Sequence, residues 1–307
     1  MSSHHFPWST LILGGVFLVG AVIFHLLERV APIYPRLLRG PRRRAYMADI
    51  TAAIVDGPVL SAISKLVACE IIIRVPQSYE LITVWPWWLQ FTVFFLVNDF
   101  MRYWLHRWYH TFPILWRLHR VHHTAVEMDT MTNYRIHVFE AVIKYGVVIF
   151  PFHVVGIDKW VLIIYSSIDI LKGYWHHANL RTYIGKLNLY FNSAEQHWWH
   201  HSAEPGGRFA NFGSVLSIWD RMFGTFYWPR GRWPETIGVH QMERFPETYW
   251  ALFASAWQDD DEAIRRYHDP TVAGDFTGAP HDPPTSAPER AAVVSGANAG
   301  DLAALGQ

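Results

Sequence analysis

The chain alternates between long apolar segments and short polar stretches rich in arginine or histidine. Residues 10–27, TLILGGVFLVGAVIFHLL, approach the ~20 apolar residues that a helix needs to cross a bilayer. Further apolar segments follow at 49–73, 84–105, 138–155 and 159–172. Because helices satisfy their own backbone groups in lipid, this pattern predicts an all-α fold, an integral membrane helical bundle with about four to five membrane segments.

Several of these segments are interrupted or short. The sequence DGP at 56–58 breaks the second one, which predicts a kinked span or a re-entrant pair. Gly156 and Asp158 separate the last two segments and predict a helical hairpin that enters the membrane and returns. Since several segments are short and carry Asp or Lys, the alternative is a set of buried core helices in a soluble protein.

An arginine-rich loop follows the first apolar segment. Its arginines are Arg29, Arg36, Arg39, Arg42, Arg43 and Arg44. The positive-inside rule predicts that this loop is cytoplasmic and that the N-terminus lies outside. Counting spans then returns the chain to the cytoplasm at His106. The first segment is not a typical signal peptide, because no Lys or Arg precedes it and no small-residue cleavage site follows it.

The composition suits a protein partly dissolved in lipid. Charged residues make up only 17% of the chain, against about 25% in ordinary globular proteins. Trp85, Trp87 and Trp88 resemble an interfacial aromatic belt. The formal net charge is zero, so no global basic field points to nucleic acid. The single cysteine, Cys69, excludes an intrachain disulfide and an iron–sulfur cluster held by the chain's own thiolates, so any electrons must come from an external donor.

Histidines are unusually frequent, with 18 in the chain, and most of them gather in short runs. Two runs have the spacing HxxHH, and a third is an i, i+4 pair. The candidate metal ligands are His106, His110, His119, His122, His123, His177, His197, His200 and His201, with His137 and His176 as further candidates. Because residues i, i+3 and i+4 share one helix face, we expect each HxxHH run to aim three imidazoles at one point.

Eight or nine imidazoles are too many for a single catalytic zinc, which uses about three protein ligands. They suit two metal ions, and the absence of a thiolate set favours a redox-active iron pair. Three alternatives remain at this stage. A zinc hydrolase would need fewer ligands and a clear general base. A b-type cytochrome would use single, widely spaced axial histidines, and a histidine-rich metal transporter would place its ligands along a path through the bilayer.

The ordered histidine runs resemble the fatty acid hydroxylase/sterol desaturase superfamily of membrane di-iron oxidases. The resemblance is carried by NDFMRYWLHRWYH (98–110), LWRLHRVHHTAVEMD (115–129), NYRIHVFE (133–140), HHANL (176–180), NSAEQHWWHH (192–201) and NFGSVLSIWDRMFGTFY (211–227). It implies a helical membrane domain over about residues 90–228, with a di-iron centre that faces the cytoplasm. It also implies O2 as the oxidant and an alkyl or sterol C–H bond as the target.

Matched run by run, the superfamily's histidine boxes fall on the nine histidines named first above. The superfamily's His–small–Asn element corresponds to His177, Ala178 and Asn179, although the neighbouring His176 competes with His177 as the ligand. His137 stands where many sterol-type members also have histidine, but Val138 follows it in place of the usual proline.

Buried carboxylates are expected behind the ligands, because ligating imidazoles usually donate their other N–H to a carboxylate or carbonyl. Asp99 precedes His106 by seven residues and Asp169 precedes His176 by the same offset, so we expect both to support histidines. The alternative is that they pair with Arg102 or Lys172.

Other residues near the histidine runs are assigned less central roles. Asn179 is assigned to the surroundings of the metal site, and Glu140 and Glu195 are weaker candidates for such support. Trp198 and Trp199 are expected at the membrane interface.

Three regions are predicted: membrane-anchoring helices with the basic loop at 1–85, a catalytic domain at 86–228, and a C-terminal extension at 229–307 that is disordered from about residue 270 because its Pro-, Ala- and Gly-rich composition cannot form a core. The expected function is O2-dependent hydroxylation or desaturation of an unactivated C–H bond in a lipid or sterol. The expected cofactors are two Fe, with electrons from a cytochrome or ferredoxin and its NAD(P)H reductase.

Overall fold

The computed structural model describes residues 8–34, 44, 46–55, 82–125, 127–204, 206–207, 209–239 and 248–257. Within these ranges the chain is helical and forms no strand, and its extended pairings are two isolated bridges. The predicted all-α fold is therefore confirmed for the described part of the chain.

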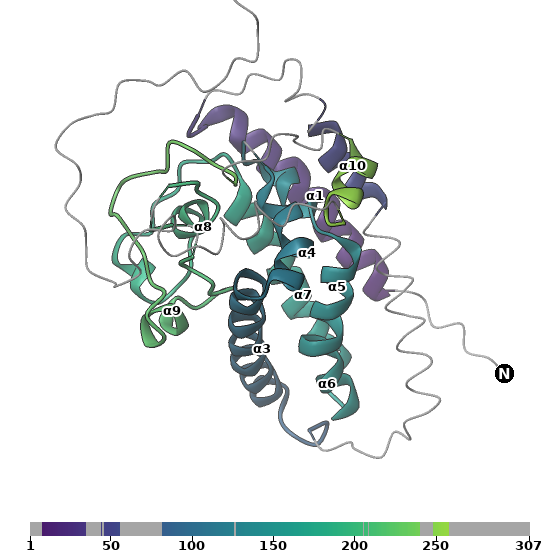
Figure 1. Ribbon diagram of the computed structural model, residues 1–307. Coiled ribbons are helices and arrows are strands. Elements are labelled where there is room, and N and C mark those ends of the chain that lie inside the picture. Colours follow the sequence, from purple (N-terminus) through teal and green to yellow (C-terminus); the bar gives the residue numbers. More distant parts are fainter. Residues whose placement is uncertain are drawn as a thin grey trace, which may run out of the picture. The chain divides into compact units, whose positions relative to one another are not determined.

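The described helices fall into four longer ones and a set of shorter ones (Figure 1). The long helices are α1 (Trp8–Val30), α3 (Trp87–Thr111), α4 (Pro113–His123) and α7 (Lys159–His177). The short ones are Tyr46–Val55, η1 (Thr130–Tyr134), α5 (Val138–Lys144), η2 (Tyr145–Ile149), α6 (Phe150–Val154), η3 (Gly185–Leu189), α8 (Ala194–His200), α9 (Ile218–Met222) and α10 (Tyr249–Ser255).

A single residue joins α3 to α4 and fixes where two histidine runs meet. Phe112 is extended and ends α3, and Pro113 opens α4 at the first helical position, where its missing N–H costs nothing. The chain therefore turns sharply between the two helices, and α3 packs on α4. His106 and His110 at the end of α3 are thereby brought against the histidines at the end of α4.

The predicted helical hairpin is present. Residues 138–154 form one continuous helical segment of α5, η2 and α6, and α7 returns after a turn in which Gly156 has a φ of 80°. Asp158 caps α7 by accepting a hydrogen bond from the backbone N–H of Trp160 at 2.7 Å. Phe94 of α3 lies against Phe152 and Tyr165, one from each arm of the hairpin. The hairpin and α3 thus share one apolar core.

One described helix, Leu11–Val30, is both long enough and apolar enough to cross a membrane. Tyr46–Val55 is apolar but shorter. Helices α3 and α7 are long enough, at 25 and 19 residues, but both carry charged side chains. The predicted interruption at 56–58 lies outside the described residues, as does the C-terminal tail from residue 258, so the span count stays a prediction.

Helix α1 is fastened to the histidine end of α7. Gly20 of α1 faces Tyr174, and a Cβ there would stand 2.9 Å from that ring. The buried carboxylate of Glu28 accepts hydrogen bonds from the backbone N–H groups of Thr130 at 2.7 Å and Asn179 at 2.9 Å. The opposite face of α1, which includes Leu18, is exposed and apolar. The helix therefore joins the domain by one side only.

Parts of the predicted C-terminal extension pack on the central region. Trp233 contacts the ring of Trp198 in α8, and Ile237 packs against the cluster that Trp198 forms with Ile33 and Met128. The backbone carbonyl of Ser255 in α10 accepts a hydrogen bond from Arg120 of α4 at 2.5 Å. These contacts tie residues 233–237 and α10 to the helices that carry histidines.

A loop between α8 and α9 offers a direct test of this packing. Gly213 lies where a Cβ would be 2.5 Å from the carbonyl oxygen of Leu216 and 2.7 Å from a carboxylate oxygen of Asp220. We expect Gly213→Ala to cost ~1–3 kcal/mol of stability, because overpacking forces the backbone to shift. Thermal unfolding of the purified protein measures this cost.

The matched control is Gly15→Ala in α1, where no atom lies within 4 Å of the added Cβ. An unchanged melting temperature in Gly213→Ala would contradict the described loop geometry.

Candidate metal centre

Nine buried or half-buried histidines form two groups. The five-histidine group contains His106, His110, His119, His123 and His200. The four-histidine group contains His122, His177, His197 and His201. In each group the candidate ligand atoms lie within 4.8 Å of one another. The structure thus brings together all nine histidines that the sequence nominated first.

The HxxHH run of α4 contributes to both groups. His119 and His123, which are four residues apart, face the five-histidine group. His122 faces the four-histidine group instead, where its ring lies 4.9 Å from that of His177. The expectation that one run aims three imidazoles at a single point is therefore wrong.

The second HxxHH run divides in the opposite sense. His197 and His201 belong to the four-histidine group, and His200 belongs to the five-histidine group. In each HxxHH run, the first and last histidines belong to one group and the middle histidine belongs to the other. The rings of His123 and His201 stack at a centroid distance of 4.3 Å, so the two groups are in direct contact.

The nitrogen spacings fit coordination to metal ions. The Nε2 atoms of His106 and His119 are 3.1 Å apart. In the other group, Nε2 of His177 lies 3.1 Å from that of His122 and 3.0 Å from that of His197. An ion that binds imidazole nitrogen at about 2.0–2.1 Å has adjacent octahedral ligand atoms roughly 3 Å apart. The geometry therefore has the edge lengths of a ligand shell.

Backbone carbonyls orient two ligands of the five-histidine group. Nδ1 of His106 lies 3.0 Å from the carbonyl oxygen of Phe212, and Nδ1 of His200 lies 2.8 Å from that of Ala210. Because a carbonyl only accepts hydrogen bonds, each Nδ1 carries the proton and each Nε2 presents its lone pair to the group.

The four-histidine group is oriented in the same way. Nδ1 of His122 donates to the carbonyl of Arg135 at 3.2 Å, and Nδ1 of His177 donates to that of Gly173 at 2.8 Å. Arg135 is itself held by a buried ion pair with Asp49 at 2.7 Å. The orientation of His122 therefore depends on a charge pair well outside the group.

Burial keeps several of these imidazoles neutral. It lowers the pKa of His200 to about 3. Burial also lowers, well below the usual value, the pKa of His122, His123, His197 and His201. A neutral imidazole has the free lone pair that a metal ion needs.

One buried nitrogen supports the fit to a metal ion. Nε2 of His200, whose Nδ1 donates to the carbonyl of Ala210, has no hydrogen-bond partner in the described part of the chain. A buried polar atom without a partner is costly, and coordination satisfies it. With nine imidazole nitrogen donors in two groups, the residues present fit two borderline transition-metal ions such as iron.

The same region of sequence matches a known family. The family model described as fatty acid hydroxylase matches residues 91–225, which include all nine grouped histidines. Residues 91–225 are therefore similar to the fatty acid hydroxylase family. This finding confirms the resemblance that the histidine runs indicated.

Curated relatives of this region act on lipids according to their names. The chain is 35% identical over 147 residues to alkylglycerol monooxygenase of Danio rerio, covering 47% of this chain and 31% of that protein. It is 28% identical over 155 residues to ornithine lipid hydroxylase OlsE of Rhizobium tropici, covering 50% and 47%. It is 29% identical over 142 residues to methylsterol monooxygenase 1-3 of Arabidopsis thaliana, covering 44% and 46%.

The chain therefore spans less than half the length of each of these relatives. No solved structure was found to match it.

The two further histidine candidates lie outside both groups. Nε2 of His176 lies 3.0 Å from the carbonyl oxygen of Asn192. Nδ1 of His137 accepts a hydrogen bond from the backbone N–H of Phe139 at 3.2 Å and caps α5. Of the adjacent pair at 176 and 177, His177 is the one that joins the four-histidine group.

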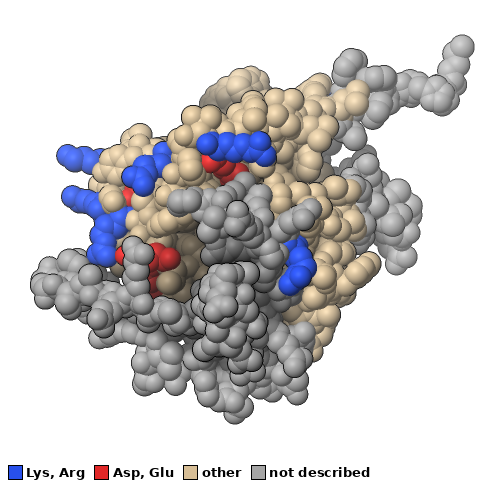
Figure 2. Space-filling model, turned by 90° about the horizontal axis from the view of Figure 1, so that it is seen from above, with Lys and Arg blue, Asp and Glu red and all other residues tan. Residues whose placement is uncertain are grey.

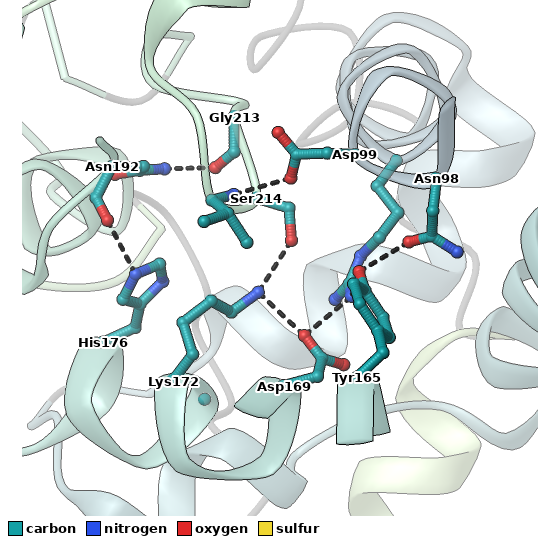
Figure 3. A network of polar contacts seen from close by, with 12 residues as sticks. Asn98, Asp99, Tyr165, Asp169, Lys172, His176, Asn192, Gly213 and Ser214 are labelled. Carbon is teal, nitrogen blue, oxygen red and sulfur yellow. Dashed lines mark hydrogen bonds and ion pairs between the residues drawn. The ribbon is translucent and has the colours of Figure 1, made fainter. Parts of the chain in front are cut away.

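The predicted carboxylates contact other partners (Figure 3). Asp99 accepts hydrogen bonds from the backbone N–H groups of Val215 and Leu216 at 2.8 and 3.0 Å, so it positions that loop instead of His106. Asp169 forms ion pairs with Arg102 at 2.7 Å and Lys172 at 2.9 Å, as the alternative interpretation had it. An offset of seven residues predicts that two side chains share a helix face, but it does not predict what each side chain contacts. Here the cations and the backbone amides lie closer to the two carboxylates than the histidines do.

The third predicted support residue, Asn179, holds the segment that follows α1. Its side-chain oxygen accepts hydrogen bonds from the backbone N–H groups of Ile33 and Tyr34 at 3.0 and 3.1 Å. The carboxylate that does reach a ligand is Glu140, whose Oε1 lies 2.9 Å from Nδ1 of His119. Glu195, the other weak candidate, accepts from Gly231 instead.

The tryptophans of the last histidine run are buried in the domain. Trp198 is 1% exposed and stacks on Tyr34, and Trp199 donates its indole N–H to the carbonyl of Arg232 at 3.0 Å. The expectation that they face the membrane interface is therefore wrong, because residues 30–34 and 228–237 cover α8.

Sequence reasoning missed the loop that orients His106 and His200. Asp220 holds it by accepting hydrogen bonds from the N–H groups of Phe212 at 2.7 Å and Gly213 at 2.8 Å. The loop presents backbone carbonyls to the histidines, and backbone groups leave no signal in the sequence. The one available signal was Asp220 in the sequence WDRMFG, an acidic residue within an apolar segment.

Removing one ligand from each group tests the division into two groups. We expect His200→Ala and His122→Ala each to lower metal affinity by at least ~10–100-fold at one position, since losing even an outer partner costs that much. Metal analysis should show one ion lost in each single variant and both lost in the double variant. Turnover should already be minimal in the singles, because ligands of one centre are not additive in activity.

His153→Ala, at an exposed position of α6, is the control and should keep the full metal content. If His200→Ala still binds two ions, His200 is not a metal ligand and its role is structural.

Proposed function

We propose that this protein is a membrane-bound di-iron oxidoreductase that uses O2 to hydroxylate or desaturate an unactivated C–H bond in a lipid or sterol-like substrate. The observation that carries the proposal is the paired histidine groups within a domain whose relatives are named as lipid and sterol oxygenases. A hydrolase or a transporter fits less well, because neither needs two clusters of neutral nitrogen ligands in contact with each other.

When bound, the two irons would supply the reduction of O2 and the oxidising power that an unactivated C–H bond requires. The five- and four-histidine groups would hold them with neutral donors. Hydroxylation consumes one O2, two electrons and two protons and returns one water with the alcohol. Desaturation consumes the same reagents and returns two waters with the alkene.

The electrons would come from an external cytochrome or ferredoxin with its NAD(P)H reductase, because the only cysteine leaves no thiolate set for a cluster. The protein's own contribution is burial and position. Eight of the nine grouped histidines are buried and the ninth is half-buried, so bulk water is kept from the ligand atoms. Oxidation at a chosen carbon requires that the substrate chain be held beside this site.

We propose that α1, α3 and the hairpin are embedded in the membrane. Each of these long helices exposes large apolar side chains: Leu18, Val22 and Leu26 on α1, Leu96 and Val97 on α3, and Ile164 and Ile168 on α7. Large exposed apolar surfaces of this kind mark contact with lipid or a partner. The lipid substrate would reach the histidines laterally from the bilayer.

Charge supports the proposed orientation, with the histidine end toward the cytoplasm. Figure 2 looks down on that end, and Lys and Arg side chains gather at one edge of the described surface while much of the rest is uncharged. Arg181, Lys186, Arg221, Arg230 and Arg232 are exposed in the segments around α8 and α9. Cytoplasmic surfaces next to a membrane carry such an excess of Lys and Arg.

Comparing lipid and sterol extracts of an expressing strain and a deletion strain by mass spectrometry tests the function. We expect a product heavier by one oxygen atom for hydroxylation, or lighter by two hydrogens for desaturation. An added oxygen must come from isotopically labelled O2 and not from labelled water. A product that forms without O2 would reject the oxidase and favour a hydrolase.

A reporter fused after residue 230 tests the orientation. With the N-terminus outside and the histidine groups cytoplasmic, a reporter that works only in the cytoplasm should be active. Activity of an exclusively extracytoplasmic reporter at the same position would overturn this topology.

A further inference from the structure

The two histidine groups differ in what orients their ligands. Backbone carbonyls accept the outer N–H of His106, His200, His122 and His177. Among the grouped histidines whose outer nitrogen has an identified partner in the described part of the chain, His119 is the one that faces a carboxylate. This carboxylate belongs to Glu140 and serves the five-histidine group.

Glu140 and His119 form a rigid, enclosed pair. Oε1 of Glu140 lies 2.9 Å from Nδ1 of His119, and their side chains are 7% and 4% exposed. Tyr109 contacts both members of the pair. Its ring lies nearly parallel to the His119 imidazole at a centroid distance of 5.2 Å, and its hydroxyl donates to the backbone carbonyl of Glu140 at 3.0 Å. The carboxylate therefore has little freedom to turn away.

The second oxygen of this carboxylate is less well compensated than the first. Oε2 of Glu140 is buried and has no hydrogen-bond partner in the described part of the chain. A buried carboxylate with one neutral donor is poorly compensated. Lys144 follows one helical turn later on α5 and supplies part of the compensation. A metal ion held through His119 would supply a second positive charge on the opposite side.

We propose that Glu140 makes the two metal positions unequal: the five-histidine group binds its ion more tightly and holds it at a lower reduction potential than the four-histidine group does. A carboxylate that accepts the Nδ1–H of a ligating imidazole raises the basicity of Nε2 and fixes the ring. Its negative charge also favours the more highly charged state of the ion. A neutral backbone carbonyl provides the orientation but not the charge.

This inference rests on the proposed di-iron function and assigns Glu140 the role of a positioning residue. It also predicts an order of loading, in which the five-histidine group fills first. The second ion, in the four-histidine group, would then be the one that is more easily lost.

The test uses the full-length protein in detergent, stripped of metal and titrated with Co(II). The wild-type chain should bind two equivalents in two distinguishable steps. Glu140→Gln keeps the size and one acceptor oxygen but removes the charge. It should weaken the tighter step by ~10–100-fold and leave the other step unchanged. Glu195→Gln, another buried carboxylate close to the ligands that accepts from Gly231 and Asn188, is the matched control.

A double-variant cycle assigns the effect to one group. In the His197→Ala background the four-histidine group is broken, and Glu140→Gln should still weaken the remaining site. In the His119→Ala background the partner of Glu140 is gone, and Glu140→Gln should change nothing further. Equal weakening of both steps, or an effect that persists without His119, would overturn the proposal.

A potentiometric titration of the iron-loaded protein gives a readout that a purely structural role would not move. Glu140→Gln should raise the potential of one iron only, and Mössbauer spectra should show one altered doublet beside one unchanged doublet. If two ions bind in wild type and Glu140→Gln shifts neither affinity nor potential, this inference fails while the proposed function stands. If fewer than two ions bind in wild type, the di-iron proposal itself fails.

Discussion

Ring nitrogens at the buried centre of this domain approach one another at 3.0–3.2 Å. Some of these contacts can be hydrogen bonds, but the outer nitrogens of His106, His122, His177 and His200 already donate to backbone carbonyls, so these imidazoles have no further proton to share when neutral. Lone pairs then face each other inside a shell that excludes water. A cation in each group relieves that repulsion. Metal binding therefore stabilises the folded arrangement of this centre.

The surrounding architecture follows from the need to hold rings from four elements in place. The single-residue joint at Phe112 brings the ends of α3 and α4 together, and the capping box of Ser193 and Gln196 starts α8 at a fixed point. The irregular loop at 210–213 serves the same end, because its backbone carbonyls at Ala210 and Phe212 accept the outer N–H groups of His200 and His106. Two carboxyl side chains hold this loop and the residues that follow it, Asp220 by accepting from the N–H of Phe212 and Asp99 by accepting from that of Val215, and thus act one step away from the ligands.

The ligands could be predicted from sequence because a histidine's spacing on a helix determines its face. The division into two groups could not, because it depends on which neighbouring helix meets each side of α4 and α8. His122 contacts His177 of α7, which lies 55 positions later in the sequence. The outer partners were predicted poorly for a related reason: most are backbone carbonyls, and the expected carboxylate at Asp169 found two cations closer than any imidazole.

The central claim is that one chain holds two ions, one in each histidine group. Anomalous diffraction from crystals of the iron-loaded, full-length protein, collected on both sides of the iron absorption edge, tests it most directly. The account predicts two iron peaks, one enclosed by His106, His110, His119, His123 and His200 and the other by His122, His177, His197 and His201. A single peak, or iron bound outside these groups, would contradict it.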